Sequence, residues 1–298
     1  MNVALSPELQ LRVRRDEPMA KHTSWRVGGP VDMFFTPRDR HELASFLRAL
    51  PPATPLYWVG LGSNLLVRDG GIRGVVICTH GAFTQLERRA QRRVWCEAGV
   101  PCTRLARQCG KWELGQAEFF AGIPGTFGGA LAMNAGAYGG ETWKLVRNVE
   151  LMGRDGQLRT RQASEFQVGY RHVVGPVADE WFLAAELEFG ARSATETGTV
   201  RELSAQRRRT QPLGEWSCGS VFTNPPGDHA ARLIEAAGLK GFRIGGAVVA
   251  EKHANFILNE NNASARDLEE LIMHVQQTVQ RVHGITLKPE VRIVGEAL

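Results

Sequence analysis

The spacing of apolar and polar positions predicts a chain of mixed helices and short strands. The clearest helix spans 265–283, where Ser264 and Asp267 form an N-terminal capping box and Gly284 ends the helix. Its apolar face consists of Leu268, Leu271, Ile272, Val275, Val279 and Val282. A second helix is predicted at 41–50, with an apolar face formed by Leu43, Phe46, Leu47 and Leu50.

Short apolar runs predict strands in the first two thirds of the chain. Residues 56–60 form one such run. Residues 65–77 indicate two strands joined by an Asp-Gly-Gly turn, which is typical of a hairpin. Strands then dominate from 94 to 190, interrupted by a helix around 101–111.

The last third of the chain adds helices and a terminal strand. The composition shifts near 193–198, where we expect a boundary, and a basic helix at 200–209 and a helix starting near Asp228 follow. The final strand, 286–295, alternates between apolar and charged positions. Its two faces are Leu287, Val291 and Ile293 on one side, and Lys288, Glu290 and Arg292 on the other. We therefore expect an α+β fold with two or three subdomains.

Glycine is concentrated in one uncharged stretch. It makes up 33 of the 298 residues, whereas its usual share is about 7%. Seven glycines lie in 121–140, and no charged residue occurs between Glu118 and Glu141. A membrane-spanning helix needs about 20 mostly apolar residues, but Pro124, Asn134 and the glycines argue against one. The stretch is therefore predicted to be a loop or turn lined by backbone.

The remaining composition indicates an intracellular protein without a metal. The net charge of +5 suits an anionic ligand, and the basic runs lack the interleaved aromatic residues typical of nucleic-acid binding. Five cysteines without a C-x-x-C pair indicate neither a disulfide framework nor a zinc site. The N-terminal residues lack the apolar segment of a signal peptide, so we expect a cytoplasmic location.

A strand that runs into Gly-x-Gly-Ser-Asn is the first candidate binding element. Residues 59–67, VGLGSNLLV, predict a turn whose backbone N–H groups can face an anion. The dinucleotide fingerprint G-x-G-x-x-G fails, because Leu65 stands where the last glycine is needed. A phosphate-cradling turn and an ordinary turn both remain open.

The glycine-rich stretch 121–141 is the second candidate. Its first four glycines let the backbone approach a bulky ligand, and Thr126 offers a hydroxyl. The P-loop pattern is absent, because no lysine follows these glycines as that pattern requires. The space left by the missing side chains is filled either by another element, as in a tightly packed glycine turn, or by a flat ligand such as a flavin.

Six motifs occur in the order found in one enzyme family. They are GSNLLV (62–67), AGIPGTFGGALAMNAGAYG (121–139), GYR (169–171), CGSVFTNP (218–225), KHANFILN (252–259) and PEVRIVGE (289–296). Through them, from His22 to Glu296, the sequence resembles the UDP-N-acetylenolpyruvoylglucosamine reductases, or MurB family. Its length resembles the shorter class of that family, which lacks an extra substrate-covering loop.

The resemblance implies a fold and a division into domains. The fold would be the FAD-binding fold of the vanillyl-alcohol-oxidase (PCMH) type in two subdomains, 1–85 and 86–197. An α+β substrate-binding domain, 198–298, would follow. The last strand, about 286–296, would return to the active site.

The resemblance also implies a reaction. NADPH would reduce non-covalently bound FAD, and hydride would then pass to enolpyruvyl-UDP-N-acetylglucosamine, which is UDP-N-acetyl-3-O-(1-carboxyvinyl)-glucosamine. The product would be UDP-N-acetylmuramate for peptidoglycan synthesis, which makes the chain a UDP-N-acetylmuramate dehydrogenase. The dianionic enolate formed on the way needs cationic and hydrogen-bonding stabilisation and one proton.

Three residues match the catalytic positions of the family. Arg171 would hold the substrate carboxylate and stabilise the enolate, because its planar fork suits a carboxylate. Ser220 would protonate the enolate carbon, and Glu290 would help to polarise the enol carboxylate. Without the resemblance, each has an ordinary explanation: a strand-edge arginine, a turn serine, and a solvated acid paired with Lys288 or Arg292.

The binding residues implied by the resemblance come from the same motifs. FAD contacts are expected from Gly62, Ser63, Asn64, Leu65, Gly122, Ile123, Gly125, Thr126 and Gly129. Asn224 is expected to bind the uridine diphosphate. No histidine lies in the two glycine motifs, so covalent attachment of FAD is not expected. Beyond the UDP-sugar and NADPH, we expect no nucleic-acid, membrane or protein partner.

Two departures from the family lie in the substrate domain. Thr223 stands where family members often carry lysine, and Cys218, beside the Gly-Ser pair, suggests a thiol sensitive to oxidation. Three alternatives remain open: an FAD oxidase of the same fold acting on another small molecule, a flavin- or nucleotide-binding module without turnover, and a basic RNA-binding protein.

Overall fold

The chain forms two compact units, each built from three separate segments. The computed structural model describes residues 5–191 and 200–298. Unit 1 comprises Met1–Arg15, Met33–Gly60 and Gly74–Gln206, and unit 2 comprises Asp16–Asp32, Leu61–Arg73 and Arg207–Leu298. The boundary expected at 193–198 lies outside the described residues. The contiguous three-part division expected from the sequence stays a prediction.

A five-stranded antiparallel sheet is the frame of unit 1. Its order is β12-β11-β15-β7-β6. The strands are β6 (Leu86–Arg88), β7 (Arg93–Glu97), β11 (Val146–Gly153), β12 (Leu158–Gln162) and β15 (Glu180–Glu188). Strands β11 and β12 form a hairpin in which Leu151 faces Arg159. The strands predicted between 94 and 190 are confirmed.

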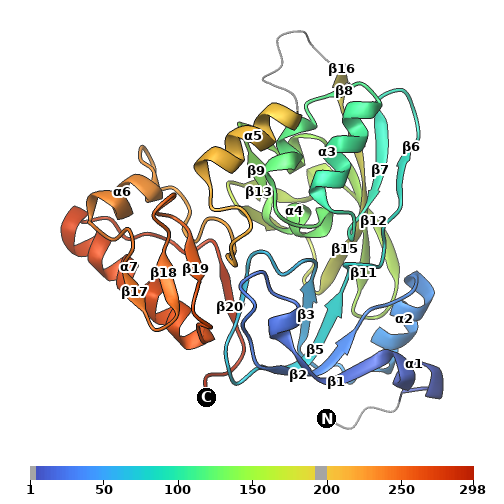
Figure 1. Cartoon of the computed structure of the whole chain (residues 1–298). Helices are drawn as coiled ribbons and strands as arrows, with labels where there is room; N and C mark the ends of the chain where they lie inside the picture. Colours follow the sequence, from blue (N-terminus) through green and yellow to red (C-terminus); the bar gives the residue numbers. More distant parts are fainter. Residues whose placement is uncertain (1–4, 192–199) are drawn as a thin grey trace. The chain divides into compact units, whose positions relative to one another are not determined.

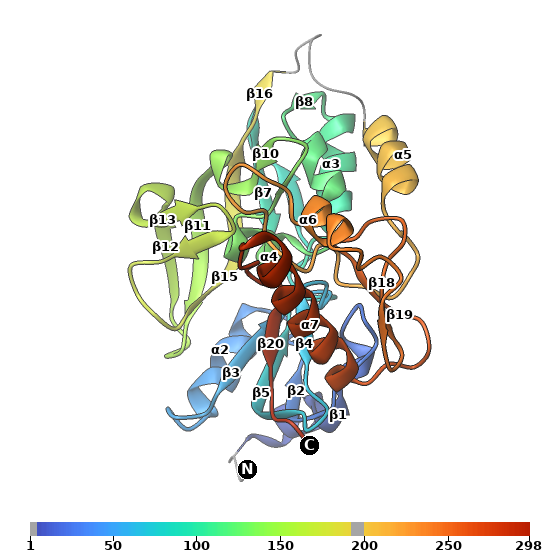
Figure 2. The ribbon, with the colours of Figure 1, turned by 90° about the vertical axis from the view of Figure 1, so that its left-hand side faces the viewer.

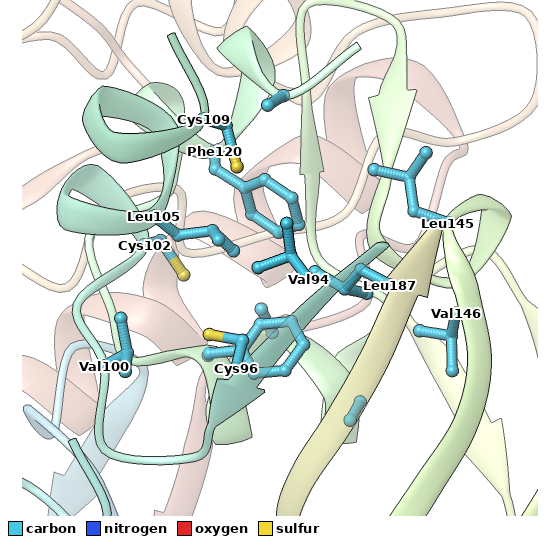
Figure 3. Packing of buried hydrophobic residues seen from close by; sticks show 14 of the residues in the cluster. Val94, Cys96, Val100, Cys102, Leu105, Cys109, Phe120, Leu145, Val146 and Leu187 are labelled. Atoms are coloured by element: carbon cyan, nitrogen blue, oxygen red, sulfur yellow. The ribbon is translucent and has the colours of Figure 1, made fainter. Parts of the chain in front are cut away.

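Two helices cover this sheet and share one apolar core with it. They are α3 (Cys102–Lys111) and α4 (Phe127–Met133) (Figure 1). Val94 of β7, Leu187 of β15 and Leu105 of α3 point into the same cluster, with Phe120 between them (Figure 3). The helix predicted at 101–111 is confirmed.

The second core of unit 1 lies under α2 (Arg40–Ala49), as the 41–50 pattern predicts. Asp39 caps this helix by accepting a hydrogen bond from the Glu42 N–H at 2.8 Å. The predicted apolar face, Leu43, Phe46, Leu47 and Leu50, is buried. A four-stranded sheet of order β1-β2-β5-β3 belongs to this region. Its strands, preceded by α1 (Pro7–Arg12), are β1 (Val13–Pro18), β2 (Pro30–Phe35), β3 (Leu56–Val59) and β5 (Ile72–Cys78).

The hairpin predicted at 65–77 is wrong. Strand β4 (Leu65–Val67) pairs in parallel with β20 (Arg292–Val294) from the C-terminus (Figure 2). Strand β5 pairs in parallel with β3 instead. The Asp-Gly-Gly turn directs the chain past β2, where Gly71 has a φ of +83° and an added Cβ would lie 1.9 Å from the Pro30 carbonyl oxygen. A distant segment therefore supplies the partner that the local turn does not.

Unit 2 packs α7 (Ala265–His283) against a small antiparallel sheet. The sheet has the order β17-β18-β19, with β17 (Arg243–Ile244), β18 (Ala247–Val249) and β19 (Ile257–Asn259). The capping box of Ser264 and Asp267 and the end at Gly284 are confirmed. Leu268, Leu271, Ile272, Val275 and Val279 are buried as predicted. Val282 is 52% exposed, contrary to prediction, because the packed face ends a turn earlier and His283 turns toward the Leu233 carbonyl.

The glycine-rich stretch contains more regular structure than the predicted loop. Helix α4 lies inside it, preceded by the 3-10 helix η2 (Glu118–Gly122). Phe127, Ala130 and Leu131 give α4 a buried apolar face, which explains why a helix forms despite two glycines. In the described residues, no helix has the length and apolar character needed to cross a membrane.

The remaining elements of the structure are short, apart from α5. Helix α5 (Val200–Thr210) confirms the basic helix, and α6 (Ala230–Ala236) begins two residues after the predicted start. Strand β20 covers only the end of the predicted final strand, although Leu287 and Val291 are buried as expected. The others are η1 (Met19–Lys21), β8 (Leu114–Gly115), β9 (Gly136–Ala137), β10 (Gly140–Glu141), η3 (Thr142–Lys144), η4 (Ala163–Glu165), β13 (Gln167–Gly169), β14 (His172–Val174) and β16 (Gly190–Ala191).

Candidate active site

The Gly-Ser-Asn turn of unit 2 requires glycine at position 62. Gly62 has a φ of +62°, and an added Cβ would lie 2.0 Å from the His22 carbonyl oxygen. The Ser24 N–H donates a hydrogen bond to the Gly62 carbonyl at 3.2 Å. The turn predicted from the sequence is present, and its tightness comes from the neighbouring 22–24 segment.

Asn64 ties this turn to the C-terminal motif. Its side-chain Nδ2 donates to the Glu290 carbonyl at 3.0 Å, and its own carbonyl accepts from the Arg292 N–H at 3.1 Å. Leu65 then pairs with Arg292 at the start of the parallel β4–β20 ladder. Within unit 2, the residues expected to contact the cofactor thus also fix the backbone of a residue expected to be catalytic.

The Ser220 and Glu290 motifs lie side by side in unit 2. The Glu290 N–H donates to the Val221 carbonyl at 2.7 Å, and Phe222 forms an antiparallel bridge with Pro289. Ser220 directly precedes Val221 and is half-buried. No side chain or backbone group of the described residues hydrogen-bonds to its hydroxyl, which leaves that hydroxyl able to act on a substrate.

Cys218 lies in the same neighbourhood but is not a reactive thiol. It is 4% exposed, and burial together with the nearby Glu290 carboxylate raises its thiol pKa well above the usual value. Oxidation requires an accessible thiolate. The environment of Cys218 therefore opposes the oxidative sensitivity expected from its position in the sequence.

All five cysteines give a prediction that needs no substrate. They are free and buried, and burial raises the pKa of each thiol. The five are Cys78, Cys96, Cys102, Cys109 and Cys218. Because the thiolate is the attacking form, Ellman's reagent at about pH 8 is expected to label none of them rapidly in the native protein and all five after denaturation. Rapid labelling of any thiol before denaturation would contradict its placement.

Asn224 has a structural partner in addition to its expected binding role. Its side-chain oxygen accepts a hydrogen bond from the Ala230 N–H at 3.0 Å, at the start of α6. The residue is exposed, and its amide nitrogen has no partner among the described residues. One end of the amide is thus held by the helix, while the other end faces outward.

Thr126 is the polar centre of the glycine-rich stretch in unit 1. It is 2% exposed, and its hydroxyl has no hydrogen-bond partner in the described parts of the chain. An added Cβ on Gly60 would lie 2.1 Å from this hydroxyl oxygen. Sequence reasoning missed Gly60, although it is the first glycine of the Gly-x-Gly-Ser-Asn run.

The glycines of this stretch differ in whether neighbouring residues leave room for a side chain. An added Cβ on Gly122 would lie 2.6 Å from Ala137 Cβ, and one on Gly128 would lie 2.8 Å from Ala98 Cβ. These two are required by the packing of the protein itself. Gly129, on the exposed side of α4, has no atom within 4 Å of an added Cβ. Packing among the described residues therefore does not explain Gly129.

The other two expected contacts of the stretch lie between these glycines. Ile123 is buried, and the Gly125 carbonyl accepts a hydrogen bond from the Cys102 N–H at 2.9 Å. That bond ties the start of α3 to the segment just before Thr126. The stretch is therefore anchored on α3 from one side.

Arg171 lies in the two-residue turn of the β13–β14 hairpin in unit 1. Gly169 and His172 close this hairpin, and Arg171 has a φ of +55°, which is uncommon for a residue with a side chain. Its guanidinium donates to the Gly136 carbonyl at 2.9 Å and to the Asn134 carbonyl at 3.4 Å. These carbonyls fix the direction in which the half-buried guanidinium points.

Asn134 supports the Arg171 hairpin and was missed by sequence reasoning. It is 2% exposed and ends α4 with a φ of +44°. Its Nδ2 donates to the Gly169 carbonyl at 3.1 Å, and its Oδ1 accepts from the Trp143 N–H at 3.1 Å. A single asparagine among apolar residues and glycines was the available signal, because a buried amide needs such partners.

The structure groups the expected catalytic residues by unit. Arg171 belongs to unit 1, whereas Ser220 and Glu290 belong to unit 2, where the Glu290 N–H binds the carbonyl of Val221, the residue after Ser220. Among the described residues, no three His, Cys, Asp or Glu side chains cluster in a way that could hold a metal ion.

Two segments of the chain match known protein families. Residues 31–161 match an FAD binding domain. Residues 211–294 match the C-terminal domain of UDP-N-acetylenolpyruvoylglucosamine reductase. These matches confirm the FAD-binding and C-terminal parts of the expected α+β fold.

Individual relatives agree over nearly the whole chain. A UDP-N-acetylenolpyruvoylglucosamine reductase from Alkalilimnicola ehrlichii is 59% identical over 287 residues, which is 96% of this chain and 95% of that protein. The enzyme of the same name from Methylococcus capsulatus is 57% identical, over 94% of this chain and 92% of its own length. The crystal structure of the reductase from Thermus caldophilus superposes with a TM-score of 0.80 at 31% identity, covering 95% of this chain and 98% of that one. The chain therefore belongs to the UDP-N-acetylenolpyruvoylglucosamine reductase (MurB) family.

Proposed function

We propose that this chain catalyses the NADPH-driven reduction of enolpyruvyl-UDP-N-acetylglucosamine to UDP-N-acetylmuramate, with FAD as its bound cofactor. The observation that carries this function is the 59% identity with a named reductase over 96% of the chain. The product is a precursor of peptidoglycan, so the enzyme serves cell-wall synthesis. The enzyme class is UDP-N-acetylmuramate dehydrogenase.

The residues present suit a flavin dinucleotide held without a covalent bond. The unpartnered Thr126 hydroxyl and the uncovered face at Gly129 offer a donor and a flat approach to the backbone. The Gly62 turn offers backbone N–H groups of the kind that bind a pyrophosphate. When bound, FAD supplies a carrier for hydride between NADPH and the substrate.

Arg171 is the proposed anchor of the substrate carboxylate. The Gly136 and Asn134 carbonyls hold its guanidinium in one orientation, so little side-chain freedom is lost on binding. Its positive charge stabilises the negative charge that develops on the enolate and the adjoining carboxylate. A fixed cation is more effective in this role than a mobile one, because it needs no reorganisation during the reaction.

Ser220 is the proposed proton donor, and Glu290 its neighbour at the substrate. Hydride addition leaves negative charge on the carbon next to the carboxylate, which is basic enough to take a proton from a hydroxyl. The O–H bond of Ser220 breaks as the new C–H bond forms, and solvent then restores the hydroxyl proton. Glu290 helps to polarise the enol carboxylate, and its backbone pairs with Val221, the residue after Ser220.

The substrate and the compartment follow from the same reaction. Asn224 is the proposed contact to the uridine diphosphate. Its side-chain oxygen is bound by the Ala230 N–H at the start of α6, so the contact would be made through its amide nitrogen. We place the enzyme in the cytoplasm, where a reducing environment keeps its five cysteines free. The UDP-sugar and NADPH are the partners that the reaction requires.

An anaerobic titration followed by visible spectroscopy tests this function. The purified protein is expected to be yellow, to bleach on addition of NADPH, and to regain its colour when enolpyruvyl-UDP-N-acetylglucosamine is added without oxygen. In a parallel experiment in air, rapid oxygen consumption with no response to the UDP-sugar would instead identify an oxidase of the same fold. A protein that binds flavin but does not bleach would be a binding module. A colourless protein that takes up no FAD would exclude the reductase, the oxidase and the flavin-binding module alike.

Gly129 gives a prediction that separates cofactor contact from helix stability. Alanine at this exposed helix position is expected to stabilise the FAD-free protein by about 0.5–1 kcal/mol, because glycine is a poor helix former. The same methyl group is expected to weaken FAD binding by about 5- to 150-fold, since overfilling a packed contact costs about 1–3 kcal/mol. Thermal unfolding of the FAD-free protein and fluorescence titration with FAD measure the two effects.

Gly110 offers the matched control for this substitution. It lies in α3, and an added Cβ there also meets no atom within 4 Å. Gly110→Ala is expected to bring the helix gain and leave FAD affinity unchanged. Equal FAD affinity in both variants would show that Gly129 does not contact the cofactor.

A further inference from the structure

Asn255 is a buried amide that binds the backbone next to Ser220. It is 4% exposed and lies in the KHANFILN motif, just before β19. Its side-chain Nδ2 donates to the Phe222 carbonyl at 2.8 Å, and its Oδ1 accepts from the Phe222 N–H at 3.0 Å. Its backbone carbonyl accepts from the Val221 N–H at 2.9 Å. One residue thus satisfies three backbone groups of the Val221–Phe222 pair.

The opposite edge of the same segment is bound by the Glu290 strand. The Val221 carbonyl accepts from the Glu290 N–H at 2.7 Å and from the Val291 N–H at 3.4 Å. The segment after Ser220 therefore lies between Asn255 on one side and Glu290 on the other. The side chain of Asn255 takes the place of a neighbouring strand, because it supplies both a donor and an acceptor to one residue.

The orientation of the Ser220 hydroxyl depends on this backbone. Its hydroxyl makes no hydrogen bond within the described residues, and the residue before it, Gly219, has a φ of +80°. The position of Cβ is consequently set by the peptide units on either side, and Oγ reaches only the few rotamer positions available from that Cβ. The Asn255 backbone carbonyl binds the peptide unit directly after Ser220, and the Asn255 side chain and the Glu290 N–H bind the groups that follow, whereas a glycine precedes Ser220.

We propose that Asn255 is a positioning residue for Ser220. Its amide fixes the Val221–Phe222 backbone and so holds the Ser220 hydroxyl at the distance from the substrate carbon that proton transfer requires. The role rests on the proposed function, in which Ser220 donates that proton. Asn255 itself stays buried against the backbone and acts only through Ser220.

Asn259 provides a matched control four residues further along. It is also buried, at 6% exposure, and its side chain also makes one donated and one accepted bond to backbone groups. Its Nδ2 donates to the Trp25 carbonyl at 2.9 Å, and its Oδ1 accepts from the Ala263 N–H at 2.8 Å. Its side chain therefore carries a similar structural load without binding the segment next to Ser220.

A double-mutant cycle on the FAD-loaded enzyme tests the proposal. Asn255→Asp keeps the acceptor for the Phe222 N–H but places a carboxyl oxygen against the Phe222 carbonyl. We expect flavin reduction by NADPH to stay within about twofold, and reoxidation by the UDP-sugar to slow about 10- to 100-fold, because small displacements of a reacting group cost that much. In a Ser220→Ala background, Asn255→Asp is expected to change reoxidation by less than about twofold, since the two residues act as one unit.

Amide hydrogen exchange gives a readout that does not depend on activity. In the FAD-free protein, exchange at Val221 and Phe222 is expected to accelerate in Asn255→Asp and to stay unchanged in Asn259→Asp. Should the aspartate variant fail to fold, Asn255→Ala carries the same cycle with a smaller, uncharged side chain. Thermal unfolding of each variant reports whether it is folded before its rates are compared.

The outcomes separate this proposal from the proposed function. Equal slowing of both half-reactions by Asn255→Asp, a full additional loss on top of Ser220→Ala, or the same selective loss in Asn259→Asp would each overturn the role of Asn255. Unchanged reoxidation in Ser220→Ala would instead overturn the catalytic role of Ser220. A protein that does not reduce the UDP-sugar at all would refute the proposed function itself.

Discussion

Replacing Ser220 with alanine is expected to leave flavin reduction by NADPH intact and to slow reoxidation by the enolpyruvyl substrate by about 10²- to 10⁴-fold. That range is typical for the loss of a positioned proton donor. Reduction by NADPH involves no proton transfer to the substrate carbon, so it has no need of this hydroxyl. The effect should therefore appear in one half-reaction only.

The geometry of unit 2 is the reason for expecting so large an effect. The backbone after Ser220 is held by Glu290 and Asn255, so a water molecule that replaced the hydroxyl would lack this support. Ser217, in the same segment and also half-buried, is the matched control, and Ser217→Ala is expected to reoxidise at the normal rate. Stopped-flow absorbance measures both half-reactions without oxygen. A matching loss in the NADPH step would show that Ser220 supports the flavin site rather than the proton transfer.

Replacing Arg171 with lysine is expected to lower kcat with the enolpyruvyl substrate by about 10²- to 10³-fold, the usual cost of losing one preorganised group at a developing anion. Lysine retains the charge but lacks the planar fork, so it cannot bind the Gly136 and Asn134 carbonyls and a carboxylate in one fixed geometry. The reduction of bound flavin by NADPH is expected to be unaffected. Steady-state and half-reaction kinetics measured together distinguish these effects.

Arg159 provides the control for this second substitution. It is partly buried and pairs with the exposed Asp155 of the same unit, and such surface pairs contribute little to stability. Arg159→Lys is therefore expected to keep normal kinetics. A loss in Arg171→Lys that appears in KM with kcat unchanged would assign Arg171 to ground-state binding alone, and the role in stabilising the enolate would then be wrong.

Local patterns in the sequence were sufficient for helices with complete signals. Helix α7 has a capping box, an apolar face and a terminal glycine, and both of its ends lie where they were expected. The prediction that Val282 is buried was wrong, because the helix extends beyond the surface against which it packs. The false hairpin at 65–77 has a similar origin. A turn predicts a change of direction, but the partner of β4 comes from residues 292–294, which are remote in the sequence.

In the candidate site, too, the sequence indicates which residues take part but not which residues lie next to one another. Motif order identified Arg171, Ser220 and Glu290 as a set, but it could not show that Glu290 and Val221 share a hydrogen bond. The roles of Asn134 and Asn255 were not predicted, because no periodic pattern in the sequence marks an isolated buried asparagine. Its role depends on which backbone groups happen to lie beside it.

The sequence by itself determined the mixed helix and strand content, the family, and which residue types are available for the chemistry. These follow from periodicity and from motifs, both of which are local properties of the chain. Only the tertiary structure showed which glycines of the 121–140 stretch are required by packing. Gly122 and Gly128 are required by neighbouring side chains, whereas Gly129 lies on an uncovered face of α4. Close approach between residues distant in sequence is set by packing, and packing is a property of the folded chain alone.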